Sequence, residues 1–377
     1  MKEKLCIFIS NQDWYFCSHW ISRAKAIQDA NFKVLVAVPI GDYTERIRKA
    51  GFEVMHYKLE RRILNPFFEV KTFLQLYKII RSSSPQLIIS STIKPNIYGS
   101  WIGRFLSIPT VSSINGLGFV FSDKSFKGQV LRNIAVKAFR IAGRGKKNFF
   151  VFQNENDQLT MLEKKIISKN KTRIIAGAGV NPDQFSYSME PKSSEIKILF
   201  AARLLWNKGL KDLIYAVKIL RRQNLQFRLI IAGILDKGSP NAVPEQFLLD
   251  WHQSGLITWI GESEKISDLI SKTHIAVLPT FYGEGVPKFL IEAASCGRPL
   301  VTTNTPGCNH ICRHEINGLL VPPKKPELLA NALERLIKSP KLRSDMGAES
   351  RKIVLEEFSD DIVISKTLKI YLNLANG

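Results

Sequence analysis

The stretch from Pro279 to Asn304, PTFYGEGVPKFLIEAASCGRPLVTTN, follows one apolar segment and ends in another. Its pattern predicts the end of a strand, a glycine-broken loop, a helix from about Lys288 and a second strand. Two carboxylates, Glu284 and Glu292, lie eight residues apart, one in the loop and one within the helix. This order of elements indicates one βα unit of a parallel sheet.

The loop before this helix favours an anion. Backbone N–H groups at Gly285, Val286 and the residues after Pro287 lie at the positive end of the predicted helix, where phosphate binds readily. Carboxylates do not bind phosphate, so Glu284 and Glu292 need another partner, and hydroxyl groups suit them. A sugar attached to a nucleoside diphosphate supplies both the phosphates for the loop and the hydroxyl groups for the glutamates. The alternative is that both glutamates are solvated residues without a ligand.

The length and composition of the chain predict two domains. Its 377 residues, 45% of them hydrophobic, are enough to fill two cores of ordinary size. No apolar run approaches the roughly 18–20 residues needed to span a bilayer. The first residues, MKEKLCIFISNQDW, lack the cleavage site of a signal peptide. We therefore expect an intracellular protein that is soluble or peripheral to a membrane.

The cysteines are odd in number and scattered, which suits reduced thiols. They are Cys6, Cys17, Cys296, Cys308 and Cys312. A cluster of Cys308, His310, Cys312 and His314 has alternating spacing, which brings side chains to one face only in a strand. Because Thr305-Pro306-Gly307 predicts a loop entering a helix there, we expect no metal site.

The net charge of +21 is unevenly distributed along the chain. Residues 1–190 carry 29 Lys and Arg against 14 Asp and Glu, a net of +15, and residues 191–377 carry 25 against 19, a net of +6. A basic first half implies an anionic partner, which could be nucleic acid, anionic lipid or a phosphorylated substrate. Basic residues interleaved with exposed aromatic residues, which nucleic-acid binding would favour, are not found.

Short apolar runs alternate with helical patterns through both halves, which predicts two doubly covered parallel sheets. Predicted strands cover 4–10, 32–39, 52–57, 86–90, 110–114, 149–153 and 173–175, then 196–201, 227–232, 257–260, 274–278 and 300–303. The expected linker consists of Gly177-Ala178-Gly179-Val180-Asn181 and the polar stretch near 187–195 that follows. The expected domains are residues 1–187 and 188–358, with a helix at 359–377 that crosses back to the first domain.

In parallel sheets of this kind, ligands bind at the carboxyl ends of the strands. The loops there in the first half are 11–19, 91–95 and 115–118. They provide five candidate residues for an acceptor or cleft: His19, Lys94, Asn115, Gly116 and Gly118. The alternatives are a helix cap for the histidine, an ordinary surface lysine, and glycines that only make a sharp turn.

The second half places two cations in one such loop. Arg203 and Lys208 stand five residues apart after the strand 196–201, so both could bind one diphosphate. Gly233 follows the next strand, where a missing side chain would let a nucleotide approach the backbone. The alternative is that these are ordinary loop residues.

Residues 124–154 contain eight basic residues and no acid. A helix from about 126 to 144 would place Lys137, Arg140 and Arg144 on one side. Ile134 and Ile141 would share the other side. Such an amphipathic basic helix is of the kind that lies on an anionic membrane. The alternative is a surface helix whose apolar stripe packs on its own sheet.

Taken together, these motifs resemble the GT-B retaining glycosyltransferases of family 4. The spacing of Glu284 and Glu292 is similar to the family's E-x7-E signature, and 317–321 is similar to its late strand. Ser18-His19, residues 92–99 and Asn115-Gly116-Leu117-Gly118 resemble a branch that extends polyprenyl-diphosphate-linked sugars in bacterial glycan assembly. Within that branch, α-1,3-N-acetylgalactosaminyltransferases acting on undecaprenyl-diphosphate-linked sugars are the nearest.

The resemblance implies an enzyme with two facing Rossmann-like domains, a UDP-sugar donor, with N-acetylgalactosamine favoured, and an undecaprenyl-diphosphate-linked acceptor. Arg203 and Lys208 would clamp the diphosphate. Gly233, Gly285, Val286, Pro287 and Glu292 would bind the donor, and Glu284 would hold its sugar. The protein would lie on the cytoplasmic face of the inner membrane.

Three further expectations concern the chemistry. No D-x-D triplet occurs, so neither a metal nor another cofactor is implied. Many family members have histidine where this chain has Asn115, so no general base is assigned. Trp20 replaces an arginine common after the Ser-His pair. Other possibilities are a soluble acceptor, a UDP-sugar epimerase or a basic nucleic-acid-binding protein.

Overall fold

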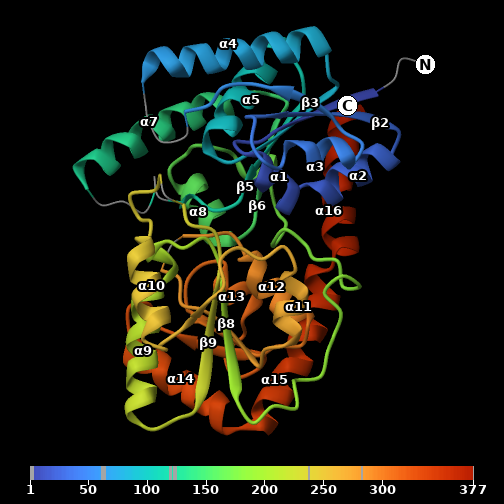
Figure 1. The fold of residues 1–377 in the computed structure, drawn as a ribbon. Coiled ribbons are helices and arrows are strands. Elements are labelled where there is room, and N and C mark those ends of the chain that lie inside the picture. The colour runs from blue at the N-terminus through green and yellow to red at the C-terminus, as the bar shows by residue number, and fades with distance from the viewer. Residues whose placement is uncertain are drawn as a thin grey trace. The chain divides into compact units, whose positions relative to one another are not determined.

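A computed structural model describes residues 4–60, 65–118, 121, 125–236, 238–281 and 283–376. The chain forms two compact units (Figure 1). Unit 1 contains Met1–Ala178 and Asp361–Gly377, and unit 2 contains Gly179–Asp360. The boundary between the units falls in the first part of the expected linker, 177–181, and the polar stretch near 187–195 lies within unit 2.

Unit 1 is built on a seven-stranded parallel sheet in the order β3-β2-β1-β4-β5-β6-β7. The strands are β1 (Lys4–Ile9), β2 (Phe32–Val38), β3 (Glu53–His56), β4 (Leu87–Ser91), β5 (Thr110–Ile114), β6 (Asn148–Phe152) and β7 (Thr172–Ile174). The apolar runs of the sequence form these strands because both faces of a parallel sheet are covered. In the pairing of β1 with β2, Cys6 lies opposite Val34.

Successive residues of β1 enter opposite cores, as the two-residue period of a strand requires. Phe8 packs with α1 (Asp13–His19), α2 (Ile21–Asp29) and α3 (Thr44–Lys49). Ile7 and Ile9 pack with α4 (Pro66–Ser83) and α5 (Ile93–Leu106). The helices α7 (Phe126–Gly143) and α8 (Glu155–Glu163) and a 3₁₀ turn (Lys169–Lys171) follow.

Two loops predicted at the carboxyl ends of the strands are wholly or partly helical. Residues 13–19 form α1, whose seven residues are too few to show a helical period in the sequence. Asp13 in its first turn is buried and accepts hydrogen bonds from Tyr43 N at 2.9 Å and Thr44 Oγ1 at 3.1 Å. In the predicted loop 91–95, α5 begins at Ile93 and includes Pro95 in its first turn. The N–H that proline lacks would form no intrahelical hydrogen bond at this position.

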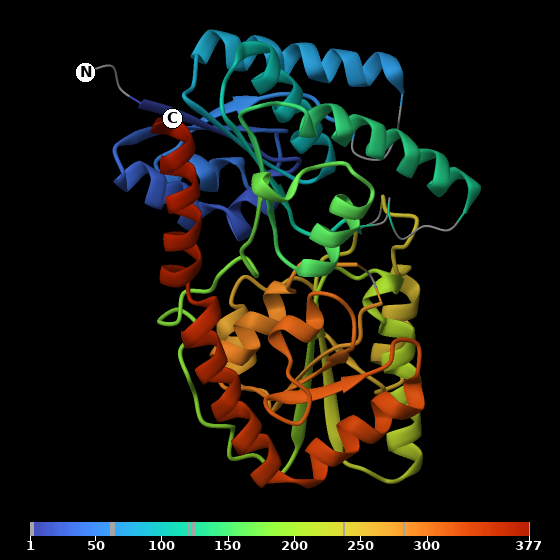
Figure 2. The ribbon, with the colours of Figure 1, turned by 180° about the vertical axis from the view of Figure 1, so that it is seen from behind.

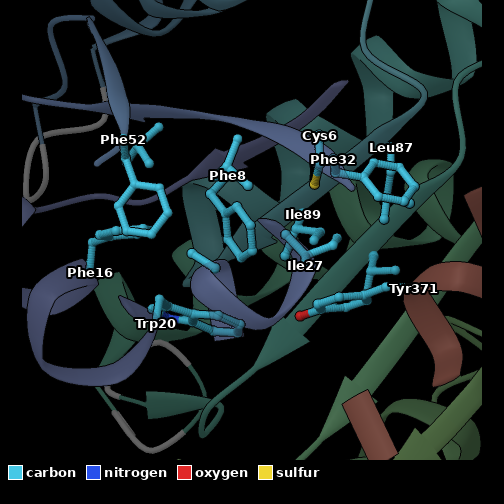
Figure 3. Packing of buried hydrophobic residues seen from close by; sticks show 14 of the residues in the cluster. Cys6, Phe8, Phe16, Trp20, Ile27, Phe32, Phe52, Leu87, Ile89 and Tyr371 are labelled. Carbon is cyan, nitrogen blue, oxygen red and sulfur yellow. The ribbon is translucent and has the colours of Figure 1, made fainter. Parts of the chain in front are cut away.

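The C-terminal helix α16 (Asp360–Asn376) packs on unit 1, as predicted. Its Val363 and Tyr371 are buried in the same core as Phe8 and Trp20 (Figure 3). The rings of Tyr371 and Phe8 meet edge to face, with centroids 6.5 Å apart and planes at 79°. The chain thus returns to its first sheet through an aromatic contact.

Unit 2 has a six-stranded parallel sheet in the order β10-β9-β8-β11-β12-β13. Its strands are β8 (Ile196–Ala201), β9 (Phe227–Ala232), β10 (Thr258–Trp259), β11 (Ile275–Leu278), β12 (Leu300–Thr303) and β13 (Gly318–Val321). This is the Rossmann order 3-2-1-4-5-6, and the first six strands of unit 1 repeat it. In unit 2 the strand order reverses between β8 and β11, where such folds bind their ligands.

The helices of unit 2 connect its strands and cover both faces of the sheet (Figure 2). They are α9 (Leu210–Arg222), α10 (Glu245–Gln253), α11 (Ile266–Ser271), α12 (Lys288–Ser295), α13 (Cys308–Ile311), α14 (Pro326–Lys338) and α15 (Pro340–Ile353), with a 3₁₀ turn at Trp206–Lys208 and a π-helical turn at Val354–Phe358. Within the described ranges, no helix is both long and apolar enough to cross a membrane.

The polar stretch before β8 is fixed to unit 2 by buried arginines. Arg298, which is 1% exposed, donates to Ser188 Oγ and to Met189 O. Arg343 forms a two-bond ion pair with Glu190, at 2.8 Å and 2.9 Å. A guanidinium that donates several bonds at once fixes backbone and side chains together. The polar residues 188–190 are thus hydrogen-bonded to unit 2. Composition alone did not distinguish such a fixed segment from a linker.

We expect Tyr371→Ala to destabilise unit 1 by about 3–5 kcal/mol, because it removes a buried aromatic ring and leaves a cavity beside Phe8. Differential scanning calorimetry would measure the change in the unfolding transition. Asn373→Ala, on the exposed side of the same helix, is the control and should shift the transition little. Equal transitions for the two variants would contradict the anchoring role of α16.

Candidate functional site

Three loops at the carboxyl ends of β9, β8 and β11 hold the predicted donor residues of unit 2. Gly233 follows β9, Arg203 and Lys208 follow β8, and Glu284 follows β11. Because these three strands are neighbours in the sheet, their loops lie at one edge. Sequence positions as far apart as 203 and 284 are thereby brought to one place.

The ion pair of Lys208 and Glu284 is the centre of this edge. Lys208 Nζ lies 2.6 Å from Glu284 Oε2, and the two side chains are only 11% and 15% exposed. The hydroxyl of Thr280 donates to Glu284 Oε1 at 2.8 Å. This hydroxyl also lies 3.1 Å from the carbonyl of Asn207, in the turn that carries Lys208. The cation and the carboxylate are therefore held in a defined geometry across two loops.

Arg203 has a different partner. Its Nη1 lies 3.1 Å from Asp236 Oδ2, in the loop after β9. Asp236 belongs to no sequence motif. Its position in the same carboxyl-end loop as Gly233 is the one sequence feature that points to it. The two predicted cations are thus each paired with a carboxylate from a neighbouring loop.

Gly233 is needed for a close approach of two backbones. Its φ is 152°, and a Cβ added there would lie 1.8 Å from the carbonyl oxygen of Ala202 in the loop after β8. Any side chain would push the Arg203 loop away from the Asp236 loop. The structure therefore gives this glycine a packing role in addition to the predicted one, which stays a prediction.

Glu292 lies in α12, where it is buried and pairs with Lys288 one helical turn earlier, at 3.2 Å. Burial raises the pKa of this carboxyl, and the Lys288 ammonium opposes that rise. Gly285, Val286 and Pro287 form the loop between Glu284 and the start of this helix. The E-x7-E pair thus consists of one carboxylate bound across loops and one bound within its own helix.

In unit 1, two of the predicted acceptor residues belong to one network. The amide of Asn115, after β5, donates to the hydroxyl of Tyr15 at 2.7 Å and accepts from Gln153 Nε2 at 3.0 Å. The Tyr15 ring stacks on His19, with centroids 4.3 Å apart and planes at 22°. Tyr15, which sequence reasoning missed, therefore joins Asn115 to His19 across the carboxyl ends of β5 and β1.

Lys94 is not part of that network. It lies in the first turn of α5, and its Nζ is 2.6 Å from Glu69 Oε1 of α4. It also donates to the carbonyl of Glu60. Lys94 therefore does contact an anionic group, but this group is the Glu69 carboxylate of the same unit.

Gly116 and Gly118 both adopt positive φ, at 110° and 63°, which makes the turn after β5. This turn is held by Asp157 of α8, whose buried carboxylate is hydrogen-bonded to the backbone of Leu117 and to the Asn154 amide. Burial raises the pKa of Asp157 to about 6, and these hydrogen bonds oppose the rise. A titratable group therefore fixes the loop that carries Asn115.

The helix predicted at about 126–144 is α7 (Phe126–Gly143). Its buried side carries Ala135, Phe139 and Ala142. Val130, Ile134 and Ile141 are 43%, 50% and 41% exposed, and they share the outward side with Lys137, Arg140 and Arg144. The expected separation of an apolar side from a basic side is wrong, because small and aromatic residues pack inward and aliphatic ones do not.

All five cysteines are free thiols. Burial raises the pKa of Cys308 to about 11. In the part of the chain that the structure describes, no group of three His, Cys, Asp or Glu side chains has a geometry that could hold a metal ion.

Sequence comparisons define the class of this protein. The family described as "Glycosyl transferases group 1" matches residues 181–353, and the family described as "Glycosyl transferase 4-like" matches residues 4–154. The chain therefore carries a glycosyl transferase 4-like domain followed by a glycosyl transferase group 1 domain, and its fold is GT-B. The predicted family and fold class are thereby confirmed.

Individual relatives cover nearly the whole chain. It is 26% identical over 360 residues, 92% of this chain and 93% of the relative, to the N,N'-diacetylbacillosaminyl-diphospho-undecaprenol alpha-1,3-N-acetylgalactosaminyltransferase of Campylobacter jejuni. It is 21% identical, over 81% of this chain and 80% of the relative, to the UDP-Gal:alpha-D-GlcNAc-diphosphoundecaprenol alpha-1,3-galactosyltransferase of Escherichia coli.

Among solved structures, Anabaena Alr3699/HepE in complex with UDP-glucose has a similar fold, with a TM-score of 0.78 and 18% identity. The match covers 97% of this chain and 99% of that one.

The raised pKa of Asp157 predicts a pH dependence of stability. The pKa of Asp157 rises from 3.8 in the unfolded chain to about 6 in the fold. Protonated Asp157 therefore adds at most about 3 kcal/mol to the free energy of unfolding. This contribution is complete below pH 4 and is lost as the pH rises through 6. Urea unfolding at several pH values should therefore show a fall in wild type that Asp157→Asn lacks. Parallel pH profiles for both proteins would contradict the assignment.

Proposed function

We propose that this glycosyltransferase moves a sugar from a UDP-sugar to an undecaprenyl-diphosphate-linked saccharide in bacterial glycan assembly. The observation that carries the donor half is the set of Lys208, Glu284, Arg203 and Asp236 at the carboxyl ends of three adjacent strands. The acceptor half is supported by the two undecaprenol-linked relatives. The favoured sugar is N-acetylgalactosamine, as in the name of the Campylobacter relative.

The reaction breaks the bond between the anomeric carbon and the diphosphate and forms a bond to an acceptor hydroxyl. Negative charge grows on the departing diphosphate, and Arg203 and Lys208 would stabilise it. Such electrostatic stabilisation usually contributes more to catalysis than any other single effect. With retention of configuration, the hydroxyl approaches on the face that the diphosphate leaves, and its proton passes to a phosphate oxygen. This route needs neither a protein base nor a metal.

Donor binding would then exchange ion-pair partners. A diphosphate competes with Asp236 for Arg203 and with Glu284 for Lys208, since each cation has a carboxylate partner in the structure. A Glu284 carboxylate that exchanges Lys208 for the donor would accept hydrogen bonds from sugar hydroxyls. Glu292, paired with Lys288, would accept from the ribose hydroxyls.

Unit 1 would bind the acceptor. Its Tyr15, His19 and Asn115 network presents aromatic and amide groups, which suit sugar hydroxyls and sugar faces, at the carboxyl ends of β1 and β5. The basic excess of residues 1–190 suits an acceptor that carries a diphosphate. The outward side of α7, with Lys137, Arg140 and Arg144 beside exposed aliphatic residues, would rest on the cytoplasmic face of the inner membrane.

The direct test is transfer from a panel of radiolabelled UDP-sugars to undecaprenyl-diphosphate-linked monosaccharides in detergent. Label should enter the lipid phase with one donor, which we expect to be UDP-N-acetylgalactosamine. The same amount of label should be transferred when EDTA removes divalent metal ions. Glu284→Gln, which keeps an acceptor for Thr280, should lose at least about a hundredfold in turnover, because a neutral amide holds the sugar less well. Glu334→Gln in α14, where the glutamate also pairs with a lysine, Lys338, is the matched control and should match wild type.

Tight UDP binding without transfer to any lipid would overturn the acceptor and leave the donor site. Interconversion of UDP-sugars without an acceptor would instead indicate an epimerase. Salt-sensitive binding of any DNA together with indifference to UDP would overturn both halves.

A second prediction isolates the cations. Arg203→Met and Lys208→Met keep most of the side-chain volume and remove the charge that would meet the departing diphosphate. Each should lower kcat about 10²–10³-fold. Lys208→Met should also lower the thermal unfolding midpoint, because it leaves the Glu284 carboxylate buried without its cation. Lys211→Met, on the exposed side of α9, should leave kcat unchanged. Full turnover in either the Arg203 or the Lys208 variant would remove that residue from the mechanism.

A further inference from the structure

The loop that carries Glu284 is held near both ends by close contacts between backbones. This loop, residues 279–287, runs from the end of β11 to the start of α12. A β-carbon added to Gly209 would lie 2.0 Å from the carbonyl oxygen of Pro279, and one added to Gly307 would lie 1.9 Å from that of Gly285. Because a β-carbon does not come within 3.0 Å of such an atom, neither contact can form without glycine.

Gly307 contacts the part of the loop that carries the carboxylate. It lies in the loop after β12, the neighbour of β11 in the sheet. Its added β-carbon would also lie 2.8 Å from the carbonyl oxygen of Glu284 itself. The φ of Gly307 is 87°, which favours glycine independently of the contact. The position of the Glu284 backbone thus depends on a residue of the next loop along the sheet.

Hydroxyl groups at the end of β12 hold the beginning of the same loop. Thr302 Oγ1 donates to the carbonyl of Leu278 at 2.6 Å, and Thr303 Oγ1 donates to the carbonyl of Thr280. Thr280 in turn donates to Glu284 Oε1. A chain of hydrogen bonds therefore runs from β12 through Thr280 to the Glu284 carboxylate.

Of the two loops that meet at Gly307, the loop of Glu284 is the less enclosed. Gly307 is followed directly by α13, whose Cys308 and Ile311 are fully buried. In the other loop Phe281 is 37% exposed and Gly283 is half-buried. Since a closely packed segment resists displacement, a β-carbon at position 307 would move the Glu284 loop rather than α13.

We propose that Gly307, together with Thr303, is a positioning residue that holds Glu284 beside Lys208 and within reach of the donor sugar. A displacement of about 1 Å at such a site can lower the rate about a hundredfold. The inference rests on the proposed function, in which Glu284 binds the sugar. It adds the loop after β12 to the three loops that carry the donor residues.

The test combines Gly307→Ala with Glu284→Gln and measures sugar transfer to the undecaprenyl-diphosphate-linked acceptor in detergent. Gly307→Ala alone should lower kcat about tenfold to a hundredfold. In the Glu284→Gln background it should lower kcat less than about threefold, because two changes that remove one interaction are not additive. A glycine needed only for folding would show no such overlap.

The matched control is Gly347→Ala in α15. A β-carbon there would lie 2.3 Å from the carbonyl oxygen of Gly297, so the clash is comparable, but it lies at the amino end of β12. This variant should lower the thermal unfolding midpoint and leave kcat close to that of wild type. Wild-type kcat in Gly307→Ala, or a loss that multiplies fully with that of Glu284→Gln, would overturn the inference.

Thr303→Val carries the test if Gly307→Ala does not fold. It keeps the shape of the side chain and removes the hydroxyl that is bonded to the carbonyl of Thr280. Its kcat should fall about threefold to tenfold, the value of one hydrogen bond, and the loss should again overlap with that of Glu284→Gln. Unchanged turnover in this variant would then overturn the inference.

A crystal structure of the variant separates this inference from the proposed function, because it needs no activity. The distance from Lys208 Nζ to Glu284 Oε2, 2.6 Å in the native chain, should lengthen until the ion pair is broken. If wild type transfers no sugar, the proposed function fails, and a broken pair still shows that Gly307 holds Glu284. An intact pair would overturn the inference whatever the activity.

Discussion

The ion pair between Lys208 and Glu284 is the interaction on which the donor site depends. Two charges with side chains 11% and 15% exposed are unfavourable unless each has a partner, because removal from water costs several kcal/mol per ion. The partners come from loops after β8 and β11, the point where the strand order reverses. The pair therefore requires β8 and β11 to be adjacent in the sheet, although β9 and β10 lie between them along the chain.

The two units share a strand order and differ in what their loops carry. In unit 2 the carboxyl ends of the strands bear opposite charges in pairs, Lys208 with Glu284 and Arg203 with Asp236. In unit 1 the equivalent edge bears a mostly neutral network through Asn115. A set of exchangeable charges suits a diphosphate, and amide and aromatic groups suit a sugar. The proposed division between donor and acceptor follows from this chemical difference on one common scaffold.

The segments that join the units are also specified by hydrogen bonds. Val180 N donates to Phe358 O at 3.0 Å, and Asp360 N donates to Val180 O at 2.8 Å. The two chain segments that leave unit 2 are thus bonded to each other. Sequence polarity near 187–195 pointed to a linker because it does not reveal which polar groups find partners.

The sequence by itself determined the parallel sheets, the returning C-terminal helix and the family, because apolar runs, helical periods and short loop motifs are local signals. It also placed Arg203, Lys208 and Glu284 in carboxyl-end loops. Only the tertiary structure decided their partners. Asp236, Thr280 and Tyr15 carry no local pattern, since they act through contacts between strands that are distant along the chain. The outward aliphatic residues of α7 were likewise decided by packing, because a helix fills the space beside its sheet by size and shape as well as by polarity.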